Sequence, residues 1–249
     1  MKRLLFGLSF VLFLHAQAQD GTPSDTTYWK KGGTSSLTFS QVSLSNWAAG
    51  GENSSSINSF FNVFADKRLR RHKWKNAMQL GYGLQKQGEG RPQKTDDKIA
   101  LQSSYGYQVT EANTRWFLSA FIDFRTQFTE GFSQDDQDSV ISRFMAPAYL
   151  TIGTGIEYSP NEFVDFSYKP LTGKLTFVLD GEIVGDAGAY GVAPGHTVRG
   201  ELGSYFSFQY KQEAITNVNL ETRLELFTNY EADNFGNIDV NWQNTIVMR

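Results

Sequence analysis

Charged side chains recur at a spacing of two residues in several parts of the chain. Asp123 and Arg125 are two apart, and so are Glu221, Arg223 and Glu225. Residues two apart in an extended strand point to the same face. Acids and bases on one face can pair with each other, or select solutes by charge when that face lines a pore. We predict a charge network in an enclosed lumen, formed by Asp123, Arg125, Arg199, Glu201, Glu221, Arg223 and Glu225.

A cross-strand ladder follows if the turn at residues 211–214 sets the register of the strands on either side. Arg199 then falls near Glu225, and Glu201 falls near Arg223. The ladder has two interpretations: a constriction that selects solutes by charge, or ion pairs that fill a narrow lumen. We favour the second, because small barrels are usually packed inside.

Residues suited to catalysis or metal binding are few. The chain has three histidines and no cysteine. His196 lies in a long segment with Asp180 and Asp186, which leaves a hydrolase at a barrel rim as the least favoured hypothesis. The acidic run at 134–138 lacks the glycine and the final glutamate of an EF-hand loop. We therefore predict that the chain is not an enzyme, and we assign no catalytic, cofactor-binding or metal-binding residue.

The elements that position these charges are predicted to be β-strands. Between residues 99 and 109, apolar and aromatic side chains alternate with small and polar ones, which is typical of a strand with one apolar face. The segment at 163–179 is the weakest, because Pro170 interrupts it and neither parity is clean. Ten strands are predicted, around residues 33–43, 55–66, 74–84, 99–109, 116–128, 150–158, 163–179, 198–210, 218–230 and 238–248.

The connections between these strands alternate in length. Four are short, at 67–73, 110–114, 159–162 and 211–214, and the first of these is strongly basic. Five are longer and rich in glycine or aspartate, at 46–54, 87–97, 129–139, 180–197 and 231–237. Short periplasmic turns opposite long external loops are typical of an outer-membrane barrel. We therefore expect an all-β, antiparallel transmembrane β-barrel with about ten strands visible and both termini on the periplasmic side.

Aromatic residues support the membrane interpretation over a secreted soluble β-sandwich or barrel, which would show the same alternation. Six of them flank the predicted short turns, where an interfacial belt would lie. The charged side chains of each strong strand share one parity, so the other face can meet lipid. Unpaired backbone groups in hydrocarbon are costly, so the first and last strands are expected to meet. The predicted periplasmic-side belt consists of Trp29, Trp74, Tyr107, Trp116, Tyr158 and Tyr210.

The N-terminal residues predict export. Lys2 and Arg3 precede an apolar core from Leu4 to Leu14, and Ala16 to Ala18 supply a small-residue cleavage site. We assign residues 1–18 to a signal peptide, 19–31 to a disordered periplasmic lead-in and 32–249 to the barrel. The 26 acidic and 23 basic residues nearly balance and form no basic stripe, so nucleic acid is not an expected partner.

Several segments resemble an uncharacterised outer-membrane family of Bacteroidota-type bacteria, domain of unknown function 3078. They are residues 46–51 (NWAAGG), 94–98 (KTDDK), 124–128 (FRTQF), 146–150 (APAYL), 188–192 (GAYGV) and 199–203 (RGELG). The resemblance runs from about Trp29 to the end and implies an outer-membrane β-barrel without an assigned activity. Similar proteins continue through further strands and finish on an aromatic residue. Because this chain ends at Val247-Met248-Arg249, we expect a C-terminally truncated part of a barrel of about twelve strands rather than a complete ten-stranded variant.

Our sequence-based hypothesis is therefore an outer-membrane β-barrel, of unassigned activity, that serves as a small-solute channel. The alternative is a non-conducting structural or assembly component of a membrane complex. Outer-membrane lipid and the barrel-assembly machinery are the expected partners, and no cofactor is expected. The loop at 46–53 either folds into the lumen as a plug or presents Trp47 to a partner; the alternative is that Trp47 is an ordinary interfacial tryptophan.

Overall fold

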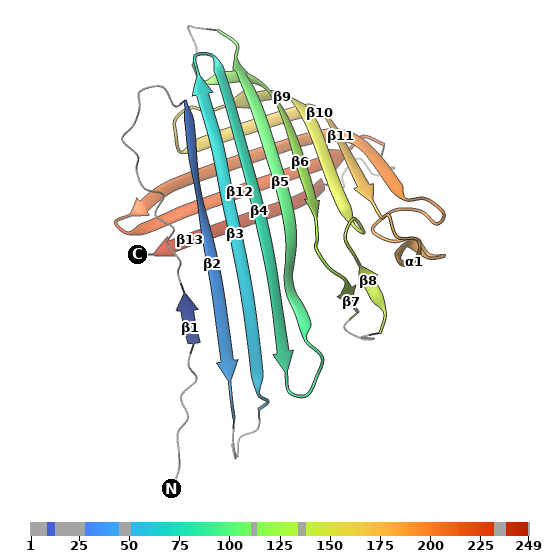
Figure 1. The fold of residues 1–249 in the computed structure, drawn as a ribbon. Helices are drawn as coiled ribbons and strands as arrows, with labels where there is room; N and C mark the ends of the chain where they lie inside the picture. Colours follow the sequence, from blue (N-terminus) through green and yellow to red (C-terminus); the bar gives the residue numbers. More distant parts are fainter. Residues whose placement is uncertain are drawn as a thin grey trace.

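A computed structural model describes residues 9–12, 28–44, 51–110, 114–133, 138–231 and 238–248. Among these residues, eleven strands form one antiparallel sheet in the order β1-β2-β3-β4-β5-β6-β9-β10-β11-β12-β13, and β7 pairs with β8 (Figure 1). The strands of the large sheet are β1 (Ser9–Leu12), β2 (Trp29–Val42), β3 (Ser54–Leu69), β4 (His72–Gln87), β5 (Gln93–Gln108), β6 (Trp116–Thr126), β9 (Ala148–Tyr158), β10 (Val164–Phe177), β11 (Val198–Ile215), β12 (Val218–Asn229) and β13 (Ile238–Met248).

The predicted alternation is present in these strands. On β6, Trp116, Leu118 and Ile122 are 40%, 54% and 42% exposed, whereas Phe117 and Asp123, which have the opposite parity, are 2% and 7% exposed. This pattern follows from the two-residue period of a strand. The sheet therefore has an apolar outer face and an inner face that carries the charged side chains, as the sequence predicted.

The ten predicted strands are all present, but the sheet does not close. Figure 1 shows it curling until β11, β12 and β13 pass behind β2 to β5. Among the described strands, β13 pairs only with β12, while β2 pairs with β3 and, over Leu37–Ser40, with β1. The expected meeting of the first and last long strands is therefore not seen. Instead, side chains of β12 reach across the interior to β5 and β6.

A β-bulge explains why the sequence pattern of β10 is poor. The register with both neighbouring strands shifts between Tyr168 and Thr172, around Pro170. Before the bulge Lys169 is buried at 2% exposure, and after it Thr172 is fully buried. Because the bulge inserts an extra residue, the buried parity changes from odd to even within one strand. Pro170 therefore marks a bulge within a continuous strand rather than its end.

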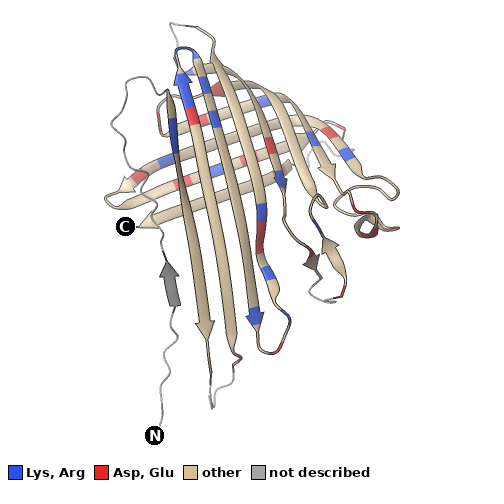
Figure 2. Cartoon of the chain, viewed as in Figure 1, with Lys and Arg blue, Asp and Glu red and all other residues tan. Residues whose placement is uncertain are grey.

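The described residues of two long connections, 127–147 and 178–197, form a small cap at one end of the sheet. It contains the β7–β8 hairpin (Gly131–Phe132 and Val140–Ser142) and the short helix α1 (Gly181–Val184). Ala146, Val178, Val184 and Val192 are buried together in this cap. Figure 2, in the same view, shows acidic and basic residues interspersed over strands and cap rather than gathered by sign. Within the described residues, no helix has the length and apolar character needed to cross a membrane.

Candidate functional site

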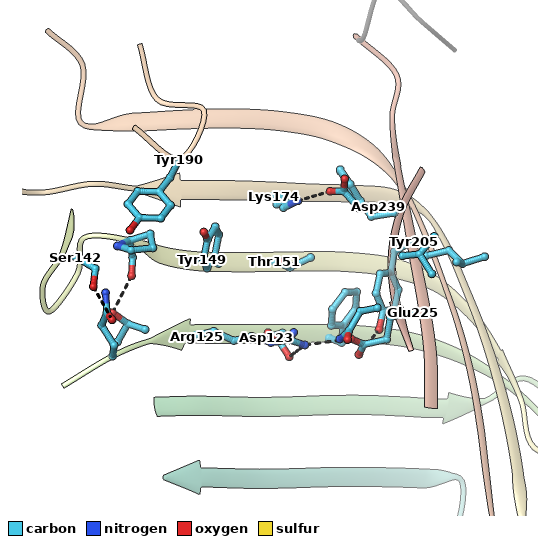
Figure 3. Close-up of a pocket in the computed structure, with 18 of the residues that line it drawn as sticks. Asp123, Arg125, Ser142, Tyr149, Thr151, Lys174, Tyr190, Tyr205, Glu225 and Asp239 are labelled. Atoms are coloured by element: carbon cyan, nitrogen blue, oxygen red, sulfur yellow. Dashed lines mark hydrogen bonds and ion pairs between the residues drawn. The ribbon is translucent and has the colours of Figure 1, made fainter. Parts of the chain in front are cut away.

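Four charged side chains meet in the interior and form what we call the central charge cluster: Asp123 and Arg125 on β6, and Arg223 and Glu225 on β12 (Figure 3 labels all but Arg223). Arg125 Nε lies 2.7 Å from Asp123 Oδ1, and its Nη2 lies 3.2 Å from Glu225 Oε2. Arg223 Nη2 lies 2.7 Å from Glu225 Oε1. Two acids and two bases therefore neutralise each other across the interior.

Neutral side chains complete the hydrogen bonding of this cluster. Tyr205 Oη donates to Glu225 Oε1 at 2.9 Å, and Asn241 Nδ2 donates to Oε2 at 2.7 Å. Gln102 on β5 donates to Asp123 and accepts from Arg223. Asp123 and Glu225 are only 7% and 6% exposed. Buried charges are tolerated when they are paired and hydrogen-bonded in this way.

The cluster separates two cavities. The cap-side cavity, with a volume of about 850 Å³, is lined by Arg125, Tyr149, Tyr190 and Glu225, among others (Figure 3). The turn-side cavity, with a volume of about 550 Å³, lies toward the short turns. Both are lined by Phe121, Asp123 and Tyr205, and the rings of Phe121 and Tyr205 stack with centroids 4.8 Å apart. These side chains, with the cluster, form the partition between the cavities.

Arg143 forms three ion pairs within the cap over the cap-side cavity. Arg143, which follows β8, lies 3.0 Å from Glu130, 2.6 Å from Asp180 and 3.1 Å from Glu182. Asp180 also caps α1 by accepting from the Glu182 backbone N–H. Its hydrogen bond with Arg143 lowers the pKa of Asp180. We call these four residues the Arg143 latch, because they join the β7–β8 hairpin to α1.

Tyr190 lines the cap-side cavity from the 178–197 connection (Figure 3). Its hydroxyl donates to the Ile141 carbonyl at 2.7 Å, and burial raises its pKa. The backbone of Tyr190 has a φ of 52°, which is uncommon for a residue with a bulky side chain. The hydrogen bond of Tyr190 thus joins the 178–197 connection to β8.

A second charge group lies at the turn-side cavity, whose lining includes Lys75, Glu157 and Asp165. Lys73 on β4 is 2.5 Å from Glu157 on β9 and 3.7 Å from Asp165 on β10. Lys75 is 2.7 Å from Asp165. This group was not predicted from the sequence, because Lys73 was assigned to a basic turn and the strand was expected to begin at Trp74. The signal that could have found it is the spacing of two between Lys73 and Lys75.

The predicted charge network is only partly assembled. Asp123, Arg125, Arg223 and Glu225 come together as predicted, but Arg199 pairs with Glu201 at 2.8 Å, and Glu221 pairs with Lys211 at 3.0 Å. The predicted ladder of Arg199 with Glu225 and Glu201 with Arg223 is wrong.

The ladder fails because its turn was placed too early. β11 continues to Ile215 and β12 begins at Val218, so Ser207 faces Glu225 and Gln209 faces Arg223. The positive φ of Asn217, 66°, marks the true turn. A shift of the turn by a few residues moves every partner along the strand, which is why Arg199 lies far from Glu225 in the register.

The six residues of the predicted aromatic belt lie near the short-turn end of the sheet. Trp29 and Trp74 have ring centroids 5.6 Å apart, and Trp116 and Tyr158 are 4.6 Å apart. Tyr107 lies 5.2 Å from His72, and Tyr210 faces Val164 and Thr222 in the register. Their position at a periplasmic interface stays a prediction. Trp47 falls outside the described residues.

Residues considered for catalysis or metal binding show no assembled centre in the described part of the chain. No group of three or more His, Asp or Glu side chains there is placed to hold a metal ion. Asp180, considered with His196, is engaged by Arg143 instead. The acidic run at 134–137 lies outside the described residues.

Fold and interior together define an all-β antiparallel sheet protein with an apolar outer face and a charged inner one. Residues 39–132 match the model of a family described as protein of unknown function (DUF3078), which confirms the resemblance over that segment. No curated protein matches the chain. A solved structure described as the NanC porin in a rhombohedral crystal form aligns with 89% of this chain and 98% of its own at 10% identity, with a TM-score of 0.33. At that score the likeness supports no argument about function.

Proposed function

We propose that the ten long strands span the outer membrane and that the curled sheet passes small polar solutes through its interior, past the central charge cluster. The observation that carries this proposal is the pair of cavities, of about 850 and 550 Å³, on the two sides of one charged partition. An inner face rich in hydrated or paired charges beneath an apolar outer face is the arrangement of a conducting barrel. The proposed function involves no catalytic step. The expected partners of the protein are outer-membrane lipid and the barrel-assembly machinery.

Conductance in planar bilayers tests this function. The wild-type protein is expected to give small, discrete single-channel steps. Arg125→Ala shortens a side chain of the partition and is expected to enlarge the steps, while Arg223→Glu reverses a charge there and is expected to shift selectivity toward cations. The matched control is Arg91→Ala, since Arg91 pairs with Asp138 through side chains that are 70% and 81% exposed. Silence of wild type and Arg125→Ala at every voltage would exclude the channel.

A second function is favoured by the completeness of the partition. Glu225 accepts from or pairs with Arg125, Arg223, Tyr205 and Asn241, so the interior is bridged at its centre. An interior packed with ion pairs is also the arrangement expected of a non-conducting scaffold in a membrane assembly. This role predicts that the protein gives no current in bilayers. It also predicts that a partner protein co-purifies with it after mild detergent extraction, and that this co-purification is lost when residues 46–53 are deleted.

The membrane position can be tested separately, because the chain has no cysteine. A spin label at Ile152→Cys, on the outer face of β9, is expected to be relaxed by oxygen dissolved in lipid. A label at Ser104→Cys, which lines the turn-side cavity, is expected to respond to a water-soluble relaxation agent. The reverse pattern would show that the apolar face is the core of a water-soluble protein.

A further inference from the structure

Lys169 is a buried lysine without an acidic partner. Only 2% of the residue is exposed, and its ammonium donates to Ser119 Oγ and Ser167 Oγ, each at 2.5 Å. Within the described residues, no carboxylate oxygen lies within 4.0 Å of it, although all other buried charged residues in the interior form ion pairs. A buried charge is costly unless it is paired.

The nearest acids are already occupied by other lysines. Glu157 is paired with Lys73 at 2.5 Å, and Asp165 is paired with Lys75 at 2.7 Å. Lys73 and Lys75 therefore take both of these carboxylates as ion-pair partners. Lys169 lies among them without an ion pair of its own within 4.0 Å in the described part of the chain.

A second lysine on the inner face is half-buried and also lacks an ion pair. Lys98 on β5 donates to Gln79 Oε1 at 2.9 Å and forms no ion pair within 4.0 Å among the described residues. The carboxylates of the central charge cluster, in contrast, are all neutralised by Arg125 and Arg223. Among the buried charged residues that the structure describes, Lys169 is the one without an ion pair within 4.0 Å.

The space beside Lys169 can hold a counter-ion. Lys169, Ser167 and Ser207 all line the turn-side cavity of about 550 Å³. An ammonium has three N–H donors, and the two serines take two of them. Serine hydroxyls can also donate to an anion. The wall thus offers a positive charge, hydroxyl donors and an adjoining volume.

We propose that Lys169, with the hydroxyls of Ser167 and Ser207, binds a small anion in the turn-side cavity: chloride, phosphate or a carboxylate. The site deepens the proposed function by making its solutes anionic. Transport of the bound anion rests on the proposed function, whereas binding of the anion does not. Binding itself requires no passage through the central charge cluster.

Chloride binding tests the site without any current. In neutral detergent, wild-type protein is expected to broaden the chloride-35 resonance, and phosphate is expected to compete this broadening away. Lys169→Met removes the charge and is expected to abolish the broadening. Lys31→Met is the matched control, because Lys31 is exposed on β2 and should leave the broadening unchanged. Heat-modifiable migration on a gel checks that each variant is folded.

A second variant keeps the lysine and supplies a counter-charge from within. Ser167→Asp places a carboxylate where a hydroxyl now lies 2.5 Å from the ammonium. This variant is expected to lose chloride broadening while remaining folded. No broadening by the wild-type protein, or equal broadening by wild type and a folded Lys169→Met or Ser167→Asp, overturns the site.

Reversal potentials under a KCl gradient separate the two proposals. Anion preference in the wild type that falls in both variants supports the site and the channel together. Silent bilayers with chloride binding that is lost in both variants reject transport and support the site. Current with the same ion preference in wild type and both variants overturns the site and leaves transport standing.

Discussion

The guanidinium of Arg125 on β6 lies 3.2 Å from the carboxylate of Glu225 on β12, although β9, β10 and β11 lie between these strands in the sheet. A contact of this kind requires the sheet to curl back over its own inner face. The same curl brings Arg223 within 3.1 Å of Gln102 on β5. β2 and β13 do not pair with each other in the described sheet. The central charge cluster therefore links the two parts of the sheet through side chains.

We expect Glu225→Ala to destabilise the protein by about 3 kcal/mol, because removal of one partner leaves buried cations without their counter-charge. Glu225 is 6% exposed and contacts both Arg125 and Arg223. Urea unfolding in detergent, followed by tryptophan fluorescence, measures the change. Asp138→Ala is the control, since it breaks the pair with Arg91 at a highly exposed position and should have little effect. Equal effects of the two variants would contradict a buried cluster that stabilises the curl.

Disulfide formation tests the register of β11 and β12. Ser204 faces Thr228, so the double variant Ser204→Cys with Thr228→Cys is expected to oxidise readily. The ladder predicted from sequence would instead place Ser204 opposite Leu220, whose partner in the structure is Gln212. Ser204→Cys with Leu220→Cys is therefore expected to stay reduced. The chain has no native cysteine, so cross-linking is read directly as a shift in gel mobility.

The strands could be predicted from sequence because each carries a local, two-residue pattern. Leu118 and Ile122 on β6 are exposed on the outer face while Asp123 is buried, as their parity predicts. β10 was the exception, since the bulge around Pro170 changes parity inside the strand. A sequence pattern records which residues share a face, but not where an extra residue is inserted.

The site was harder to predict because it depends on contacts between distant strands. Arg125 and Glu225 were both assigned to the inner face, but nothing in their local sequence says that they meet. The proposed ladder failed on the turn near Asn217, where a small error in position displaced every pair. Lys169 was overlooked because its importance lies in the lack of an ion pair, which becomes visible only when the fold shows that Glu157 is paired with Lys73.

The Arg143 latch is expected to loosen in acid. The hydrogen bond from Arg143 lowers the pKa of Asp180 below its ordinary value of 3.8. A carboxyl whose pKa is lower in the folded state stabilises the fold fully above that ordinary value, and this contribution is lost as pH falls through the folded-state pKa. Glu130 and Glu182 also face Arg143. We expect the protection of residues 178–197 against hydrogen exchange, measured relative to an unfolded peptide at the same pH, to fall below about pH 4.

Asp180→Asn separates the charge from the cap of α1, because asparagine is an equally good N-cap. In this variant the exchange of residues 178–197 is expected to depend less on pH, while α1 stays protected near neutral pH. Arg143→Gln is expected to raise exchange at all pH values. A wild-type pH profile that Asp180→Asn leaves unchanged would show that Asp180 is not the source of the acid response.

The bulge in β10 is expected to require a glycine at position 155 on β9. A Cβ added to Gly155 would lie 2.1 Å from the Tyr168 carbonyl oxygen and 2.8 Å from the Cα of Lys169, so backbone would have to move. We expect Gly155→Ala to cost about 1–3 kcal/mol, as overpacking does in well-packed interiors. Gly173→Ala is the matched control, because a Cβ at Gly173 meets nothing within 4 Å. Urea unfolding in detergent compares the two variants. Equal stability would show that β9 and β10 can separate at the bulge, and that Lys169 is not held in place by the strand beside it.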